Sequence, residues 1–176
     1  MSLIASQHTF LLYELGLLSL KAALSTRAAR APIYAATCGE HQRGAIRNSF
    51  RKVFVDIQSK YKEGCIKEKD HIDYIECVSN DISIAHATSL HNGRFRFGVC
   101  QKLINIHLKY LWVAGFVAEP PHCPIDGIVR DLASLNYDWI TSDSRDEYIG
   151  AIADLRKVAT TRTLSVWELE EFQRRP

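Results

Sequence analysis

Apolar residues recur every three or four positions along most of this chain, which is the spacing of a helix with one buried face. Residues 45–62 give the clearest example, and their apolar positions are Ile46, Phe50, Val53, Phe54, Ile57 and Tyr61. A face of leucines predicts another helix over residues 7–28, with Pro32 just beyond its end. The same period continues from Asp70, a candidate N-cap, to about residue 85, and returns over residues 98–116.

Turn and capping signals divide the last third of the chain. Three prolines in "EPPHCP" must interrupt the helical pattern, and Pro124 can occupy the first turn of the helix that follows. Ser144 with Glu147, and Ser165 with Glu168, have the spacing of a capping box and predict two further helices. No convincing strand pattern is present. We therefore predict an all-α, compact single-domain globule of six to eight helices over residues 1–176, with residues 29–44 and 116–124 as loops.

The composition is that of an ordinary globular protein, with 47% hydrophobic and 24% charged residues. Five cysteines are scattered without a C-x-x-C pair, which favours free thiols in a reducing cytoplasm over disulfides or structural zinc. His122 and Cys123 are adjacent but have no second pair of ligands, so we expect no metal and no cofactor. The apolar run 10–24 contains Glu14 and Lys21 and is short for a membrane span, so we expect no membrane partner.

Charge is distributed unevenly along the chain. Residues 1–112 contain 15 Lys and Arg against 9 Asp and Glu, a net charge of +6, whereas residues 113–176 contain 7 against 11, a net charge of −4. A basic half joined to an acidic half is typical of a protein that binds a polyanion, and also of a protein that associates with itself as a homo-oligomer. Ordinary solvated surface charge is the third explanation.

Arginines cluster at two places. Arg47 and Arg51 lie four residues apart on one face of the helix predicted over residues 45–62, and Arg43 precedes them in the sequence. In "RFRF", Arg94 and Arg96 alternate with two phenylalanines, which indicates a short extended segment with a basic side and an aromatic side. Guanidinium groups bind phosphate well, and interleaved aromatic residues can contact bases. The alternative is an exposed face that serves only solubility.

The helix predicted over residues 98–116 is apolar nearly all round but carries a polar stripe. Lys102, Asn105 and Lys109 fall at i, i+3 and i+7, so they lie on one side of that helix. A charged lysine directed into an apolar core costs several kcal/mol unless it is paired or neutral. The stripe therefore faces either solvent or a cleft.

Two segments resemble the catalytic elements of DNA glycosylase/lyases of the endonuclease III superfamily. "GVCQKLIN" is similar to the second part of their helix-hairpin-helix, and "PIDGIVRDL" is similar to their later catalytic element. The resemblance implies that Lys102 is the Schiff-base nucleophile, that Asp126 is the catalytic carboxylate and that Gly98 lies in the turn that contacts DNA. Cys100 stands where that family has a second glycine, and the match covers about a fifth of the chain.

Taken together, the sequence predicts a protein that acts on nucleic acid, and DNA in the first place. The expected nucleic-acid contacts are Arg43, Arg47, Arg51, Arg94, Arg96, Gly98, Asn105 and Lys109. A non-enzymatic helical subunit that binds nucleic acid or another protein is the alternative, because it needs only the arginines. Helical ribonucleases of the HEPN type are disfavoured, since Arg94 and Arg96 lie too far from His107 and no other arginine has a histidine at the required spacing.

Overall fold

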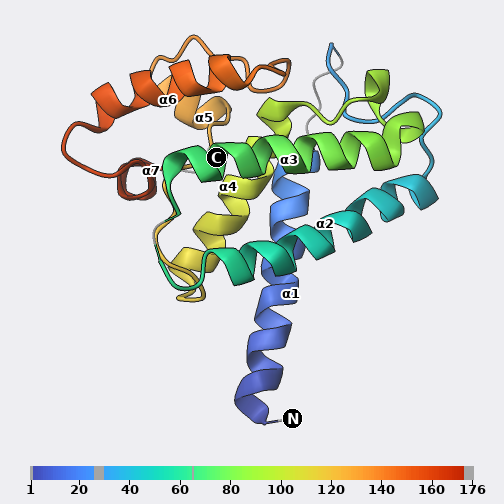
Figure 1. The fold of residues 1–176 in the computed structure, drawn as a ribbon, viewed down its shortest axis with the longest axis horizontal. Helices are drawn as coiled ribbons and strands as arrows, with labels where there is room; N and C mark the ends of the chain where they lie inside the picture. The colour runs from blue at the N-terminus through green and yellow to red at the C-terminus, as the bar shows by residue number, and fades with distance from the viewer. Residues whose placement is uncertain (1, 26–29, 65, 173–176) are drawn as a thin grey trace.

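The computed structural model describes residues 2–25, 30–64 and 66–172, and within these it is entirely helical apart from loops (Figure 1). Seven α-helices occur in the described part of the chain, which confirms the predicted all-α class. Their bounds are α1 Leu3–Leu24, α2 Glu40–Lys60, α3 Glu68–His86, α4 Phe97–Val113, α5 Gly127–Leu132, α6 Arg145–Ala159 and α7 Leu164–Glu171. Two short 3₁₀ turns, η1 Ala87–Ser89 and η2 His91–Gly93, connect α3 to the segment before α4.

Helix α4 is the centre of the molecule. All of its residues from Phe97 to Leu108 are buried, because its sequence is apolar around most of the circumference. Helices α1 and α3 make the most extensive contacts with α4, and α2 packs beside them. The N-terminal half of α1 extends away from this body (Figure 1). None of the described helices is long and apolar enough to cross a membrane.

The structure confirms one of the two predicted loops and shortens the other. Residues 116–124 are irregular, as the prolines require. Residues 30–39 are irregular too, but α2 begins at Glu40, so the prediction of a loop up to residue 44 is wrong. The polar sequence of this first turn is stabilised by Gln42, whose side chain accepts a hydrogen bond of 2.7 Å from the Gly39 amide. Residue 29 and the predicted helical end 26–28 lie outside the described residues.

Capping explains most of the other helix boundaries. Ser144 accepts a hydrogen bond from the Glu147 amide and begins α6, as predicted. The same prediction for Ser165 is wrong, because Thr163 caps α7 and the Ser165 hydroxyl instead donates to the Pro120 carbonyl at 2.8 Å. Helix α3 begins at Glu68, so Asp70 lies in its first turn and is not the N-cap. Capping signals therefore found the right helices but not always the right first residue.

Candidate functional site

The polar side chains of α4 divide into two groups with different surroundings. Lys102 and Lys109 face a cleft, whereas Gln101 and Asn105 are completely buried. The cleft has a volume of about 620 Å³ and lies between α1, α4, α7 and the loop that precedes α5. Its polar lining is Lys102, Lys109, Tyr110, Asp126 and Glu168, and its apolar walls include Leu15, Ile106, Pro124, Leu169 and Phe172. Of the two alternatives left open for the stripe, solvent or a cleft, the cleft applies to the two lysines.

Lys102 and Asp126 converge in this cleft. The Lys102 ammonium lies 3.9 Å from Asp126 Oδ2, and the two side chains are 11% and 19% exposed. The ammonium also lies 4.1 Å from the centre of the Trp139 ring, a cation–π distance. Burial lowers the pKa of Lys102, and the nearby Asp126 carboxylate opposes that shift. The amine is therefore easier to deprotonate than an exposed lysine.

Asp126 has two distinct tasks. Its Oδ1 accepts hydrogen bonds from the amides of Ile128 and Val129, at 2.9 and 3.2 Å, and so caps α5. Its Oδ2 faces Lys102 at a distance too long for a direct hydrogen bond. The carboxylate is thus held in place by the helix start while one oxygen stays directed at the amine.

Gln101 connects α4 directly to the loop that carries Asp126. Its Nε2 donates to the Ile125 carbonyl at 2.7 Å, and its Oε1 accepts from the Ile125 amide at 3.2 Å. Gln101 precedes Lys102 and Ile125 precedes Asp126, so this pair of bonds fixes the two reactive residues relative to each other. Gln101 is fully buried, and sequence reasoning did not single it out.

Asn105 does not reach the cleft or the surface, and the prediction that it contacts nucleic acid is wrong. Its side chain is fully buried and accepts a 3.0 Å hydrogen bond from His71 Nε2. Its amide nitrogen donates to Gln101 Oε1 at 3.3 Å and to the Tyr148 hydroxyl at 3.1 Å. Because every polar atom of Asn105 is engaged inside the protein, this residue supports Gln101 and has no free group for a ligand.

The buried network continues to a second histidine. The Tyr148 hydroxyl lies 2.8 Å from His122 Nδ1, and His122 Nε2 lies 3.1 Å from Glu68 Oε1. Since Tyr148 accepts from Asn105, its own proton is available for His122. Burial lowers the pKa of His122 to about 4 and that of His71 well below its usual value, so both rings are neutral near pH 7. His71 could have been suspected from sequence, because it falls in step with Ile75, Val78 and Ile82 on the apolar face of α3.

Lys109 lines the same cleft, but its charge is already paired. Its ammonium lies 2.7 Å from Glu168 Oε2 and 2.8 Å from Oε1, and Glu168 is 2% exposed. Burial raises the pKa of Glu168, and Lys109 opposes that shift. The Phe172 ring covers the ammonium at 4.3 Å. The pair attaches α7 to α4, so Lys109 contributes to the wall of the cleft, and the prediction that it contacts phosphate has no structural support.

Gly98 is buried at the start of α4, so the prediction of a DNA-contacting turn there is wrong. A Cβ at this position would lie 2.2 Å from the Trp139 carbonyl oxygen, and the Gly98 amide donates to the Ser142 carbonyl at 3.0 Å. The glycine is required for this close approach of two backbones. It therefore positions the segment that carries Trp139 beside Lys102.

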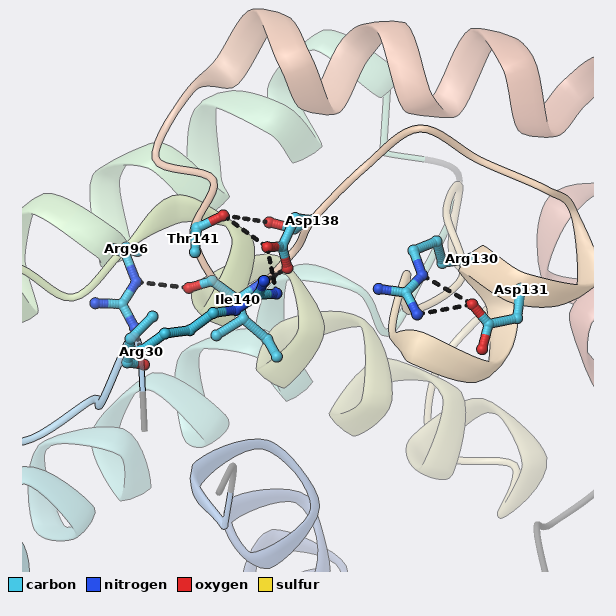
Figure 2. Close-up of polar contacts among 8 residues, drawn as sticks. Arg30, Arg96, Arg130, Asp131, Asp138, Ile140 and Thr141 are labelled. Atoms are coloured by element: carbon cyan, nitrogen blue, oxygen red, sulfur yellow. Dashed lines mark hydrogen bonds and ion pairs between the residues drawn. The ribbon is translucent and has the colours of Figure 1, made fainter. Parts of the chain in front are cut away.

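The arginines of "RFRF" also form hydrogen bonds within the protein, so their assignment to nucleic acid gains no support from the structure. Arg96 donates to the carbonyl oxygens of Ile140 at 2.7 Å and of Ala31 at 2.8 Å (Figure 2). Arg94 forms hydrogen bonds of 2.7 Å with Asp143 and with Asn80. The phenylalanines between and after them are buried, as the alternation indicated. Figure 2 also shows Arg30 beside Asp138 and Arg130 beside Asp131, two further arginines with acidic partners.

The three arginines of α2 lie on another part of the surface. Arg43 covers the Tyr34 ring at 4.9 Å, Arg51 covers the Tyr13 ring at 5.5 Å, and Arg47 is paired with Glu40. They line hollows bounded by Leu17 and Leu20 of α1, whereas the Lys102 cleft is bounded by Leu15 and Ala22. Those two pairs point to opposite sides of a helix. The basic face of α2 and the Lys102 cleft are therefore separate surfaces.

Comparison with protein-family models, with curated proteins and with solved structures gives no match. Among the described residues, no three His, Cys, Asp or Glu side chains are grouped so that they could hold a metal ion. The arrangement of Lys102 and Asp126 is therefore interpreted from its own geometry. What that geometry offers is a partly desolvated amine, a fixed carboxylate and a cleft large enough for a small organic group.

Proposed function

We propose that Lys102 attacks an aldehyde carbon of a damaged nucleic-acid sugar, with Asp126 as its acid–base partner. The observation that carries this proposal is the 3.9 Å separation of the Lys102 amine and the Asp126 carboxylate inside an open cleft. The choice of a nucleic-acid sugar rests on the resemblance of residues 98–105 and 124–132 to DNA glycosylase/lyases. The surroundings of Lys102 supply the condition that such chemistry needs, a lysine whose pKa is lowered by burial.

The reaction is addition followed by loss of water. The neutral Lys102 amine adds to the aldehyde carbon of an abasic site, and Asp126 Oδ2 takes the excess proton from the nitrogen and delivers it to the alkoxide oxygen, which gives a neutral carbinolamine. The Asp126 carboxylate then takes up a proton from water and gives it to the carbinolamine hydroxyl, the C–O bond breaks, water leaves, and an iminium links Lys102 to the sugar. Trp139 stabilises the positive charge through its ring face, at the distance it already has from the ammonium.

The dimensions of the cleft agree with a ligand of this size. Its volume of about 620 Å³ lies within the range of roughly 300–1,000 Å³ that is typical of small-molecule sites. The apolar walls, among them Ile106, Leu169 and Phe172, suit an extruded sugar better than an intact duplex. We therefore expect a substrate whose reactive carbon is exposed or turned out of the helical stack.

Borohydride trapping tests the proposal. The wild-type protein, mixed with abasic-site DNA and sodium borohydride, should give a covalent adduct with its attachment at Lys102. Lys102→Ala should abolish the adduct, whereas Lys69→Ala, which removes an exposed lysine of α3, should leave the yield unchanged. Asp126→Asn should reduce the trapping rate by about 100-fold, the usual contribution of an acid–base group, while asparagine preserves the cap of α5. A wild-type protein that forms no adduct, or a Lys102→Ala variant that still forms one, would refute the enzymatic function.

A second candidate is non-enzymatic nucleic-acid binding through α2. It is favoured by Arg43 and Arg51, neither of which forms an ion pair with any described residue. Fluorescence anisotropy with labelled single-stranded and duplex DNA at increasing salt would measure it. Salt-sensitive binding that Arg43→Ala and Arg51→Ala weaken, without any trapped adduct, would replace the enzymatic proposal with this one.

A further inference from the structure

The outward face of α1 carries a concentration of exposed apolar side chains. Of the fourteen large hydrophobic residues that are exposed in the described part of the chain, seven belong to this helix: Leu3, Ile4, Phe10, Leu11, Tyr13, Leu17 and Leu18. Leu3, Ile4 and Phe10 are 75%, 64% and 66% exposed. Their half of the helix projects from the body of the molecule (Figure 1). Such a concentration on one element is typical of an interaction surface.

The residues on this face are arranged in rows with a seven-residue repeat. Two apolar rows, Leu3, Phe10, Leu17 and Ile4, Leu11, Leu18, flank a polar row made of Gln7, Glu14 and Lys21. Because two turns of a helix take about seven residues, each row runs nearly parallel to the helix axis. The stripe is therefore suited to a partner that is itself a helix lying along α1.

We propose that the partner is α1 of a second copy of this chain, packed antiparallel. The polar row holds one acid, Glu14, and one base, Lys21. When a two-fold axis passes between Leu17 and Leu18, Glu14 of each copy lies opposite Lys21 of the other, and Leu17 lies opposite Leu18. Neither Glu14 nor Lys21 forms an ion pair with a described residue of its own chain, so both charges are available. In this register the two copies of α1 overlap over residues 11–24, and Leu3, Ile4 and Phe10 extend past the end of the partner copy's helix. Within the overlap the stripe is complementary to itself in apolar shape and in charge.

This association does not depend on the Lys102 site. Helix α1 lines that cleft through Leu15 and Ala22, which neighbour Leu11 and Leu18 at one edge of the stripe but are not part of it. Trapping at Lys102 and self-association are measured in separate experiments. Failure of one proposal therefore leaves the other standing.

Analytical ultracentrifugation of the full chain tests the arrangement. The wild-type protein should sediment as a dimer at about 100 μM, a concentration that detects dissociation constants in the micromolar range. Glu14→Lys places two lysines opposite each other at both ends of the pair and should weaken dimerisation by about tenfold or more, and Lys21→Glu should do the same with two acids. The double variant Glu14→Lys/Lys21→Glu should restore the wild-type dissociation constant.

Control variants distinguish this dimer from non-specific hydrophobic association. Ile84→Asp replaces an apolar side chain of α3 that is 81% exposed and should leave the dissociation constant unchanged. Leu17→Asp, at the centre of the pair, should abolish the dimer. A monomeric wild-type protein would overturn the proposal. A dimer that is insensitive to the single charge reversals, or one that the double variant fails to restore, would overturn it equally.

Discussion

At the scale of single residues, Gln101 explains why a core helix carries so many polar groups. Its side chain holds the backbone of Ile125 through two hydrogen bonds and receives a third from Asn105. On the buried side of α4, Gln101 and Asn105 hold the neighbouring loop in place, and on the cleft side Lys102 carries the reactive amine. We interpret Gln101 as a positioning residue, since it keeps Asp126 beside Lys102 without facing the cleft.

Gln101→Leu should separate the two reactive residues. It leaves the amide and carbonyl of Ile125 buried without partners, so the free energy of unfolding should fall by about 2–5 kcal/mol. Asp126 counteracts the effect of burial on Lys102, so its displacement should lower the pKa of Lys102 further. Mass spectrometry of Lys102 after labelling with an amine reagent across a pH series would measure that shift.

A purely structural role for Gln101 would be revealed by the same measurement. In that case the variant would be less stable, but Lys102 would react with an unchanged pH profile. Asn48→Leu, an exposed change on α2, serves as the control and should alter neither quantity. Labelling is done at a temperature where the variant is fully folded, which circular dichroism establishes.

Sequence reasoning brought Lys102 and Asp126 together but misplaced several of their neighbours. Periodicity places Lys102 and Asn105 on one stripe, yet one faces the cleft and the other is buried. The difference arises from partners distant in sequence: His71 and Tyr148 supply the hydrogen bonds that draw Asn105 inward. The local pattern of apolar and polar residues contains no information about partners that are distant in sequence. For the same reason the sequence did not predict the hydrogen bonds of Arg96 within the protein.

At the scale of elements, helices with a strong apolar period were predicted well. The boundaries of α4 and α6 fall within a few residues of their predicted positions, because burial and the Ser144 cap are both local signals. Helix α2 starts earlier than expected because its first turn is polar and has no periodic signal. For α7, two residues could have served as the cap, and tertiary hydrogen bonds of Ser165 decided between them.

Two glycine substitutions should have opposite effects on stability. Gly98→Ala places a methyl group 2.2 Å from the Trp139 carbonyl, a backbone atom that cannot move aside alone, so the free energy of unfolding should fall by about 3 kcal/mol. Gly150→Ala lies within α6, where a Cβ meets nothing within 4 Å, and should raise it by about 0.5–1 kcal/mol through the greater helix propensity of alanine. Urea unfolding followed by circular dichroism measures both.

If the start of α4 were an open turn, as the resemblance implied, Gly98→Ala would be nearly neutral. Equal effects of the two substitutions would therefore contradict the close packing of Gly98 against the segment 139–142. The Gly150 variant also controls for the general effect of adding a methyl group within a helix. Both glycines lie within α-helices, so the comparison isolates the local contact of Gly98.

At the scale of the whole molecule, the basic and acidic parts of the chain are joined by ion pairs that cross the fold. Arg30 pairs with Asp138, and Arg94 pairs with Asp143, so each pair joins a base of residues 1–112 to an acid of residues 113–176. Such pairs are partly exposed and contribute little each. They account for part of the charge asymmetry without any outside partner, so net charge alone is a weak argument for a polyanion ligand.

Stability of the whole fold should decrease in mild acid because of its buried histidines. Burial lowers the pKa of His122 to about 4, that of His107 to about 3 and that of His71 well below 6.5. Each folded pKa lies below the unfolded value, so the unfolded chain binds more protons once the pH falls below about 6.5. The contribution of the three neutral histidines to the free energy of unfolding is complete above that pH. It is lost progressively toward pH 4, and the free energy of unfolding then falls by up to about 4 kcal/mol per pH unit.

Urea unfolding at a series of pH values from about 8 to 5 measures this slope. His107→Phe provides the matched variant, because the ring can still stack on Phe54 and the Ser19 hydroxyl retains its 2.7 Å hydrogen bond to the Leu15 carbonyl. In this variant the unfolded chain should bind one proton fewer relative to the folded protein. The pH dependence of the free energy of unfolding should therefore be smaller by about 1.4 kcal/mol per pH unit. A wild-type stability that stays constant from pH 7 to 5 would mean that the three rings are not buried as neutral groups, and the polar network behind Lys102 would then need a different description.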